Sequence, residues 1–166
     1  GANRLFPEAW TDLTSRLDPS RRDDVLKSYY TELMQRSSQD RREWAVAWAR
    51  WENALISLVP EADALHPEAR RADALARLET HYFIHDGFLE RDGVLLEDCR
   101  HLAGIPGQIV QGRYDVVTPA RTSWQLARNW GKAGLDMIPD AGHAAGEPGI
   151  IDALVRATDR FGAELG

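Results

Sequence analysis

The stretch from Gln108 to Pro119 constrains the fold of this chain more than any other part of the sequence. It contains a short apolar run at Ile109 and Val110, a glycine where the chain must turn, an acid at Asp115, and a proline that suits the start of a helix. This order is typical of a buried strand that ends in a carboxylate-bearing loop. The sequence therefore predicts an α/β arrangement with Asp115 at the end of a parallel strand.

A second predicted strand, at residues 135–138, is followed directly by small residues and His143. Active sites in open α/β sheets lie just beyond the carboxyl ends of the strands, so we expect Asp115 and His143 to meet across one crevice. An acid and a His in this chain order are two members of a Ser-His-Asp triad. The nucleophile is missing, because no Gly-x-Ser-x-Gly turn occurs and neither Ser57 nor Ser123 lies in a glycine-flanked turn from strand to helix.

The chain before these strands is predicted to be helical, because apolar residues recur there at helical spacing. Ser20 and Asp23 resemble a capping box at the start of the second helix. The expected helices are 7–17, 20–36, 40–58 and 67–83, and two more follow the strands, at 119–130 and 148–161. We place a boundary in the region 87–104, which gives a helical domain at residues 1–92 and an α/β part at residues 93–166.

Two glutamates are expected to face inward from their helices. Glu52 lies at the edge of one apolar stripe, and Glu79 lies in the middle of another. The two stripes consist of Trp44, Trp48, Trp51 and Leu55, and of Leu75, Leu78, Tyr82 and Phe83. Either each glutamate pairs with an Arg or caps a backbone group, or both line one aromatic-walled pocket that receives a cation.

The composition argues against several classes of function. A formal net charge of −6 on 166 residues does not suit a surface that binds nucleic acid or an anionic membrane. A single cysteine, Cys99, excludes an internal disulfide and favours a reducing compartment, the cytoplasm, and neither a signal peptide nor a membrane-spanning run is visible. His81 and His85 have a spacing that suits a metal but lack a third ligand beside them, so we expect no metal and no cofactor.

Five stretches of the sequence together carry a family resemblance. They are residues 48–52 (WARWE), 76–83 (ARLETHYF), 105–119 (IPGQIVQGRYDVVTP), 141–143 (AGH) and 152–159 (DALVRATD). In this order they resemble the C-terminal half of a proline iminopeptidase (prolyl aminopeptidase), a family of the α/β-hydrolase superfamily. The likeness covers nearly the whole chain.

The resemblance implies a core α/β-hydrolase domain with a helical cap inserted into it. Members of the family release an N-terminal proline from peptides through a Ser-His-Asp triad. By motif position Asp115 resembles the triad acid and His143 the base. Glu52 and Glu79 resemble the cap glutamates that bind the free α-amino group of the substrate, and Phe83 resembles a wall of the proline pocket.

The family also has an N-terminal half with the serine elbow and an oxyanion loop of the His-Gly-Gly-Pro type, and neither motif occurs in this sequence. We therefore expect an incomplete α/β-hydrolase that holds most of the cap and the last two core strands. A partner, either the missing N-terminal half or another copy, is expected to cover the open sheet edge. The alternative is a non-catalytic helical binding module, or a fragment that lacks the nucleophilic serine.

Overall fold

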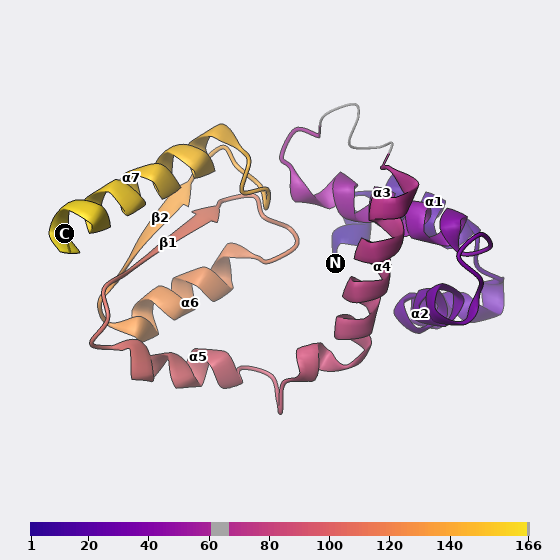
Figure 1. Cartoon of the computed structure of the whole chain (residues 1–166), viewed down its shortest axis with the longest axis horizontal. Coiled ribbons are helices and arrows are strands. Elements are labelled where there is room, and N and C mark those ends of the chain that lie inside the picture. The colour runs from indigo at the N-terminus through magenta and orange to yellow at the C-terminus, as the bar shows by residue number, and fades with distance from the viewer. Residues whose placement is uncertain (61–66, 166) are drawn as a thin grey trace. The chain divides into compact units, whose positions relative to one another are not determined.

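A computed structural model describes residues 1–60 and 67–165 of the chain, which is mostly helical with a small two-stranded parallel sheet (Figure 1). Its packing divides the chain into two compact units. Unit 1 comprises the described residues of Gly1–Ala54 and Pro60–Asp92, and unit 2 those of Leu55–Val59 and Gly93–Gly166. The short segment Leu55–Val59, which the sequence did not assign to the second part, thus belongs with the strands. Each unit is considered separately below.

Unit 1 is helical, and its α-helices lie close to where the apolar spacing predicted them. Its helical elements are η1 Ala2–Arg4, α1 Pro7–Ser15, η2 Pro19–Asp24, α2 Val25–Gln35, α3 Arg42–Ile56, α4 Ala69–Ile84 and η4 Asp86–Phe88, and the last two residues of α3 are grouped with unit 2. Pro7 suits the first turn of α1, where its missing N–H costs nothing. The predicted helix 20–36 is in fact a short 3₁₀ helix followed by α2.

The capping box expected at Ser20 and Asp23 is wrong. The carboxylate of Asp18 accepts a hydrogen bond from the backbone N–H of Ser20 at 2.9 Å and begins η2, and that of Asp24 accepts one from Lys27 N–H at 3.0 Å and begins α2. The hydroxyl of Ser20 instead donates to Asp18 at 2.7 Å. A short Asp side chain reaches an N–H two or three residues ahead, so two aspartates cap two successive helices.

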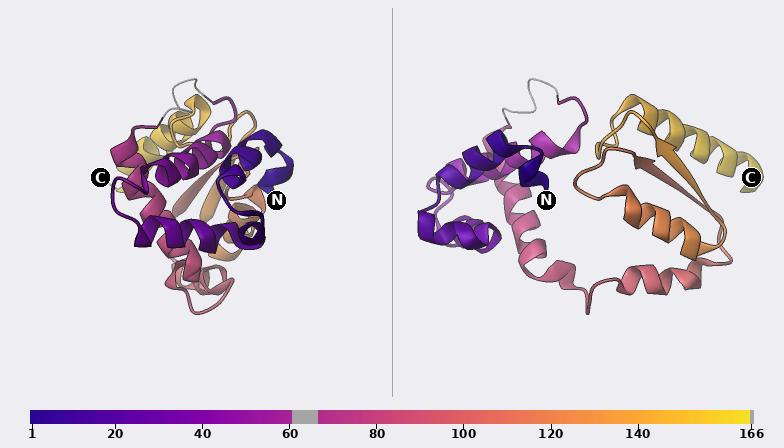
Figure 2. Two further views of the ribbon diagram at one scale, coloured as in Figure 1. Left: turned by 90° about the vertical axis from the view of Figure 1, so that its right-hand side faces the viewer. Right: turned by 180° about the vertical axis from the view of Figure 1, so that it is seen from behind.

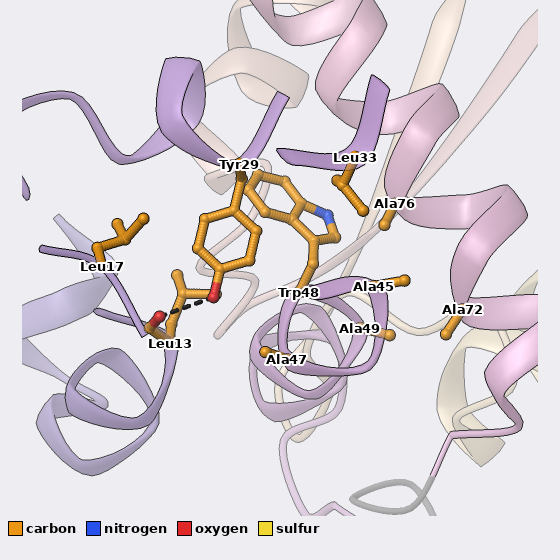
Figure 3. Close-up of a cluster of buried hydrophobic side chains, with 10 residues drawn as sticks. All are labelled: Leu13, Leu17, Tyr29, Leu33, Ala45, Ala47, Trp48, Ala49, Ala72 and Ala76. Atoms are coloured by element: carbon orange, nitrogen blue, oxygen red, sulfur yellow. Dashed lines mark hydrogen bonds between the residues drawn. The ribbon is translucent and has the colours of Figure 1, made fainter. Parts of the chain in front are cut away.

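The core of unit 1 gathers around Tyr29, Leu33 and Trp48, with Leu13 and Leu17 beside them and small alanines on α3 and α4 (Figure 3). The expected apolar face of α4 is wrong. Its large side chains, which are Leu75, Leu78, Tyr82 and Phe83, are exposed, and its buried face is made of Ala72, Ala76 and Thr80. Small residues let α4 approach its neighbours closely. The hydroxyl of the buried Thr80 donates to the carbonyl of Ala76 at 2.7 Å, so this hydroxyl is not left unpaired.

Tyr29 links two helices of unit 1 through a buried hydrogen bond. Its side chain is fully buried, and its hydroxyl donates to the carbonyl oxygen of Leu13 at 2.7 Å (Figure 3). Leu13 lies in the last turn of α1, where carbonyls lack helical partners. Burial raises the pKa of Tyr29, so the hydroxyl keeps its proton at neutral pH and remains a donor.

We expect Tyr29→Phe to lower the free energy of unfolding by about 1–3 kcal/mol, because the Leu13 carbonyl would stay buried without its partner. Urea denaturation followed by circular dichroism measures the change. Tyr114→Phe is the matched control, since the side chain of Tyr114 is exposed. A loss no larger than that of the control would contradict the expectation.

Unit 2 is a parallel two-stranded sheet between helices. Its elements are α5 Val94–Asp98, η5 Cys99–Leu102, β1 Gly107–Gly112, α6 Ala120–Trp130, β2 Ala133–Ile138 and α7 Pro148–Leu165. The strands pair in register from Gly107 opposite Ala133 to Gly112 opposite Ile138. Helix α6 forms the crossover between them, and α6 and α7 lie on opposite faces of the sheet (Figures 1 and 2). The carboxyl ends of both strands therefore meet at one edge.

A small core joins α7 to the sheet. Ile138 at the end of β2 packs with Ala141 and with Ile150 and Ala153 of α7, and Val110 of β1 lies against them. The strand ends approach closely at Gly112, where an added Cβ would lie 1.8 Å from the carbonyl oxygen of Gly142. Only glycine fits there, so the loop after β1 is held directly against the loop after β2.

Candidate active site

Asp115 and His143 come together at the carboxyl ends of the two strands. Asp115 lies in the loop after β1, and His143 lies in the loop after β2. Backbone hydrogen bonds join these loops, from Arg113 N–H to Ile138 O at 2.8 Å and from Tyr114 N–H to Ala141 O at 3.0 Å. Asp115 Oδ2 lies 2.9 Å from His143 Nδ1. The hydrogen bond expected from the sequence is therefore present.

The carboxylate of Asp115 is buried and fully supplied with donors, with only 4% of its side chain exposed. Oδ1 accepts the backbone N–H groups of Val117 at 2.9 Å and Thr118 at 2.8 Å. Oδ2 accepts the Thr118 hydroxyl at 2.8 Å and Gln111 Nε2 at 3.0 Å, besides facing His143. This network fixes the direction in which Oδ2 points at the imidazole.

These donors also decide the charge of Asp115. Burial alone would raise its pKa, but the hydrogen bonds from Thr118, His143 and Gln111 outweigh burial and hold the pKa below the ordinary value of 3.8. A depressed folded-state pKa gives stability that is present above pH 3.8 and is lost as the pH falls through the folded value. At neutral pH Asp115 is therefore an anion and an acceptor for the imidazole.

His143 can act as a base through its free ring nitrogen. A carboxylate opposite Nδ1 requires the proton of the neutral ring on Nδ1, which leaves the lone pair on Nε2. The Thr118 hydroxyl lies 3.1 Å from the same Nδ1 and helps to hold the ring. The side chain is 37% exposed, so the ring is oriented by its partners at Nδ1 and is still partly accessible to solvent.

Sequence reasoning did not assign three polar residues to this site, which are Gln111, Thr118 and Ser123, and it considered Ser123 only as a nucleophile. Gln111 is a buried residue of β1 whose Nε2 also donates to the carbonyls of Gly112 at 3.2 Å and Thr118 at 3.3 Å. Its Oε1 accepts the hydroxyl of Ser123 from α6. A glutamine that directly follows the apolar pair Ile109 and Val110 was the available signal, because a buried amide must find partners.

Unit 1 brings two of its predicted site residues, Glu79 and Phe83, to the same aromatic side chain, Trp48. Glu79 Oε2 on α4 accepts the indole N–H of Trp48 on α3 at 2.8 Å, and the ring of Phe83 lies 6.4 Å from that of Trp48. Glu52 is half-buried and lies one helical turn after Trp48 on α3. Phe83 is half exposed. The pocket that Glu52 and Glu79 were expected to share stays a prediction.

Glu79 is held in an environment that disfavours its charge. Burial raises its pKa above the ordinary 4.5, and the indole hydrogen bond opposes this only in part. The bond comes from a neutral donor, which does not compensate a negative charge as an arginine would. Such a carboxylate in an aromatic setting is a candidate for binding a cation.

His81 on α4 and His85, the residue that follows α4, lie close together. Among residues 1–60 and 67–165 no group of three or more His, Cys, Asp or Glu is placed to hold a metal ion. The rings of His81 and His85 lie 4.7 Å apart, and His85 Nδ1 bonds to the carbonyl of His81 at 2.7 Å.

In the same described ranges no helix is both long and apolar enough to cross a membrane.

Comparison with known proteins identifies the relatives of the chain. No family model matches it. It is 42% identical over 166 residues to the probable proline iminopeptidase of Leptolyngbya boryana. This alignment covers 99% of this chain and 52% of the relative. It is 44% identical over 163 residues to the proline iminopeptidase of Xanthomonas citri, with 97% and 52% covered. The chain is a homologue of the proline iminopeptidases.

A plant protein extends the same likeness. The proline iminopeptidase of Arabidopsis thaliana is 33% identical over 169 residues, which cover 100% of this chain and 44% of the relative. The chain spans about half the length of the proline iminopeptidases it matches, which is consistent with a C-terminal half. That name implies the α/β-hydrolase superfamily, and the parallel sheet with helices on both faces is compatible with part of such a fold.

Proposed function

We propose that this chain is the C-terminal part of a serine exopeptidase that releases N-terminal proline from peptides. The observation that carries the proposal is the hydrogen bond between buried Asp115 and half-exposed His143 at the carboxyl ends of two parallel strands. Relatives named proline iminopeptidase match almost the whole chain and support the substrate class. On this reading the chain supplies two members of a triad.

His143 would act as the general base and then as the general acid. Its Nε2 would take the proton of a serine hydroxyl as the serine attacks the scissile carbonyl, and would return it to the leaving amine. Asp115 would keep the imidazole in the required tautomer and stabilise the imidazolium that forms. The serine and the oxyanion donors would come from residues outside this chain.

Glu52, Glu79 and Phe83 would recognise the N-terminal proline. An exopeptidase must hold the free amine at a fixed position to remove one residue from the end, and carboxylates provide that anchor. The raised pKa of Glu79 supports this role, because an α-ammonium group would supply the positive charge that the indole of Trp48 does not. The half-exposed ring of Phe83 would lie against the pyrrolidine ring.

The missing N-terminal half is the partner that we propose for unit 2. Within the described residues the sheet has only two strands, so each strand has an edge that no further strand covers. Helix α7 also exposes the apolar side chains of Ile151, Leu154 and Val155. On this proposal residues 1–92 form most of the helical cap and residues 93–166 the last part of the α/β-hydrolase core.

The isolated chain is expected to show no turnover of a chromogenic proline amide, because a base and its orienting acid act only on a nucleophile that is present. Adding the upstream half of the same protein, by co-expression or refolding, is expected to give activity. The control is the same mixture with the elbow serine of that half changed to Ala. Turnover by the isolated chain that is lost in His143→Ala would reveal a nucleophile within these residues.

A non-catalytic helical binding module is the second candidate, and Glu79 is the observation that favours it, because its environment suits a cation whether or not a triad is complete. A well-folded mixture of both halves without turnover would support this candidate. Binding of proline amide to the isolated chain, measured by calorimetry and weakened in Glu79→Gln, would then be its positive sign.

A further inference from the structure

The loop that carries His143 is tied to a segment far away in the sequence. The backbone N–H groups of His143 and Ala144 both donate to the carbonyl oxygen of Ile56, at 2.8 and 2.7 Å. Ile56 is the last residue of α3, so its carbonyl has no partner within the helix. Within unit 2 the end of α3 and the His143 loop therefore supply each other's backbone hydrogen-bond partners.

Glu147 makes the second connection between the same two segments. Its Oε1 accepts the backbone N–H of Leu58 at 2.6 Å, and its Oε2 accepts the backbone N–H of Gly142 at 2.5 Å. Hydrogen bonds to an ionised carboxylate are roughly twice as strong as those between neutral groups. One side chain thus holds one backbone amide of the His143 loop and one of the segment after α3.

The main chain of Glu147 fixes the carboxylate in turn. Its carbonyl oxygen accepts Ile150 N–H at 2.9 Å and Ile151 N–H at 3.0 Å, which starts helix α7. Helix α7 is packed on the sheet through Ile150 and Ala153. Because Glu147 is fixed at the start of the packed helix α7, its hydrogen bonds hold the preceding loop in a fixed position relative to that helix.

The fit around Gly142 leaves no room for the loop to move toward this segment. A Cβ at Gly142 would lie 2.9 Å from Leu58 N and 3.2 Å from Ile56 O. On the other side Gly142 O is the atom that approaches Gly112. Gly142 is thus held between two stretches of backbone. The Glu147 carboxylate links Gly142 to one of them through the N–H groups of Gly142 and Leu58.

We propose that Glu147 is a positioning residue that keeps His143 in hydrogen-bonding contact with Asp115. The imidazole is partly exposed and is oriented by its Nδ1 partners, so the direction of the ring depends on where the backbone of residues 142–144 lies. Glu147 touches no reacting atom and acts through that backbone. Its effect on catalysis rests on the proposed function, but its effect on the imidazole does not.

The first test observes the imidazole directly in this chain. The Nδ1 proton of His143 is expected to give a downfield NMR signal in the wild type, assigned by its loss in His143→Ala. In Glu147→Gln the side-chain NH₂ must face one of the two amide donors, so the loop opens more often and the Nδ1 proton exchanges with water about tenfold faster. Glu147→Asp is charged but too short to span both amides, and the same change is expected. Glu164→Gln, an exposed residue of α7, is the matched control.

The second test measures catalysis by the complete protein. Glu147→Gln is expected to lower kcat for a proline amide about 10- to 100-fold with little change in KM, because a base displaced by about 1 Å costs rate and not substrate binding. An inactive wild type would count against the proposed function alone, and the NMR result would still decide the role of Glu147.

Two outcomes would overturn the proposal. One is a His143 signal and a kcat in both Glu147 variants that match those of Glu164→Gln. The other is loss of the whole fold in both variants by circular dichroism, because Glu147 would then be a general stabilising residue. A changed His143 signal with an unchanged far-UV spectrum supports the positioning role.

Discussion

Replacing Asp115 by Asn in the complete protein is expected to lower kcat for a proline amide by about 10⁴-fold, the cost of the same change in a serine protease triad. The amide NH₂ would face Nδ1 as a donor and force the ring proton onto Nε2. His143 would then have no lone pair on the side where a base must act. The substrate contacts proposed for Glu52 and Glu79 are untouched, so KM is expected to change little.

Steady-state kinetics on a proline amide measure this effect, and stability must be followed beside it. Because the pKa of Asp115 lies below 3.8, the charged form stabilises the fold, and Asp115→Asn is expected to be less stable than the wild type above that pH. The difference is expected to shrink as the pH falls through the folded pKa. Asp140→Asn is the matched control, an exposed acid after β2. A fall in kcat of less than about tenfold would remove Asp115 from the triad.

The Asp115–His143 contact could be predicted because two simple rules fix it. Apolar runs followed by a glycine or small residue mark where strands end, and parallel strands bring those ends to one edge. Both strands and the crossover helix α6 lie where these rules put them. The contact therefore depends on topology and requires no knowledge of rotamers.

The rest of the site depends on contacts that no local pattern encodes. Glu147 lies close to His143 in sequence, but its bond to Leu58 joins residues 89 positions apart. Gln111 and Ser123 meet only because α6 packs on the face of β1 that bears the Gln111 side chain. Such pairings follow from three-dimensional packing, so a single sequence gives only the hint that a buried polar residue needs a partner.

The mistaken face of α4 has a different cause. Hydropathy ranks Leu78 and Phe83 above Ala72 and Ala76, yet the alanines and Thr80 are the residues that pack in unit 1. Helices approach closely through small residues. Large apolar side chains that stay exposed are typical of a surface that contacts another molecule or segment. Glu79 then lies at the border between the packed and exposed faces, where a carboxylate is half-buried and still reachable.

Glu79→Gln is expected to separate stability from substrate recognition. The pKa of Glu79 is raised above 4.5, so its charge costs stability as the pH rises from 4.5 through the folded pKa, and no cost remains below 4.5. Glutamine resembles the neutral form, and its carbonyl can still accept the indole N–H of Trp48. At neutral pH the free energy of unfolding of Glu79→Gln is therefore expected to equal or exceed that of the wild type.

Glu79→Gln is expected to weaken recognition of a free amine even though it does not lower stability. Removing one partner of a partly buried charge pair typically costs about 2–5 kcal/mol, so kcat/KM of the complete protein for a proline amide is expected to fall about 30-fold or more. The cyclopentane analogue, which has the same ring without the nitrogen, gains nothing from the carboxylate and should be affected far less. Glu68→Gln, an exposed glutamate just before α4, is the control. Equal losses on both substrates, or a variant less stable than the wild type at pH 7, would make Glu79 a structural residue of the Trp48 contact.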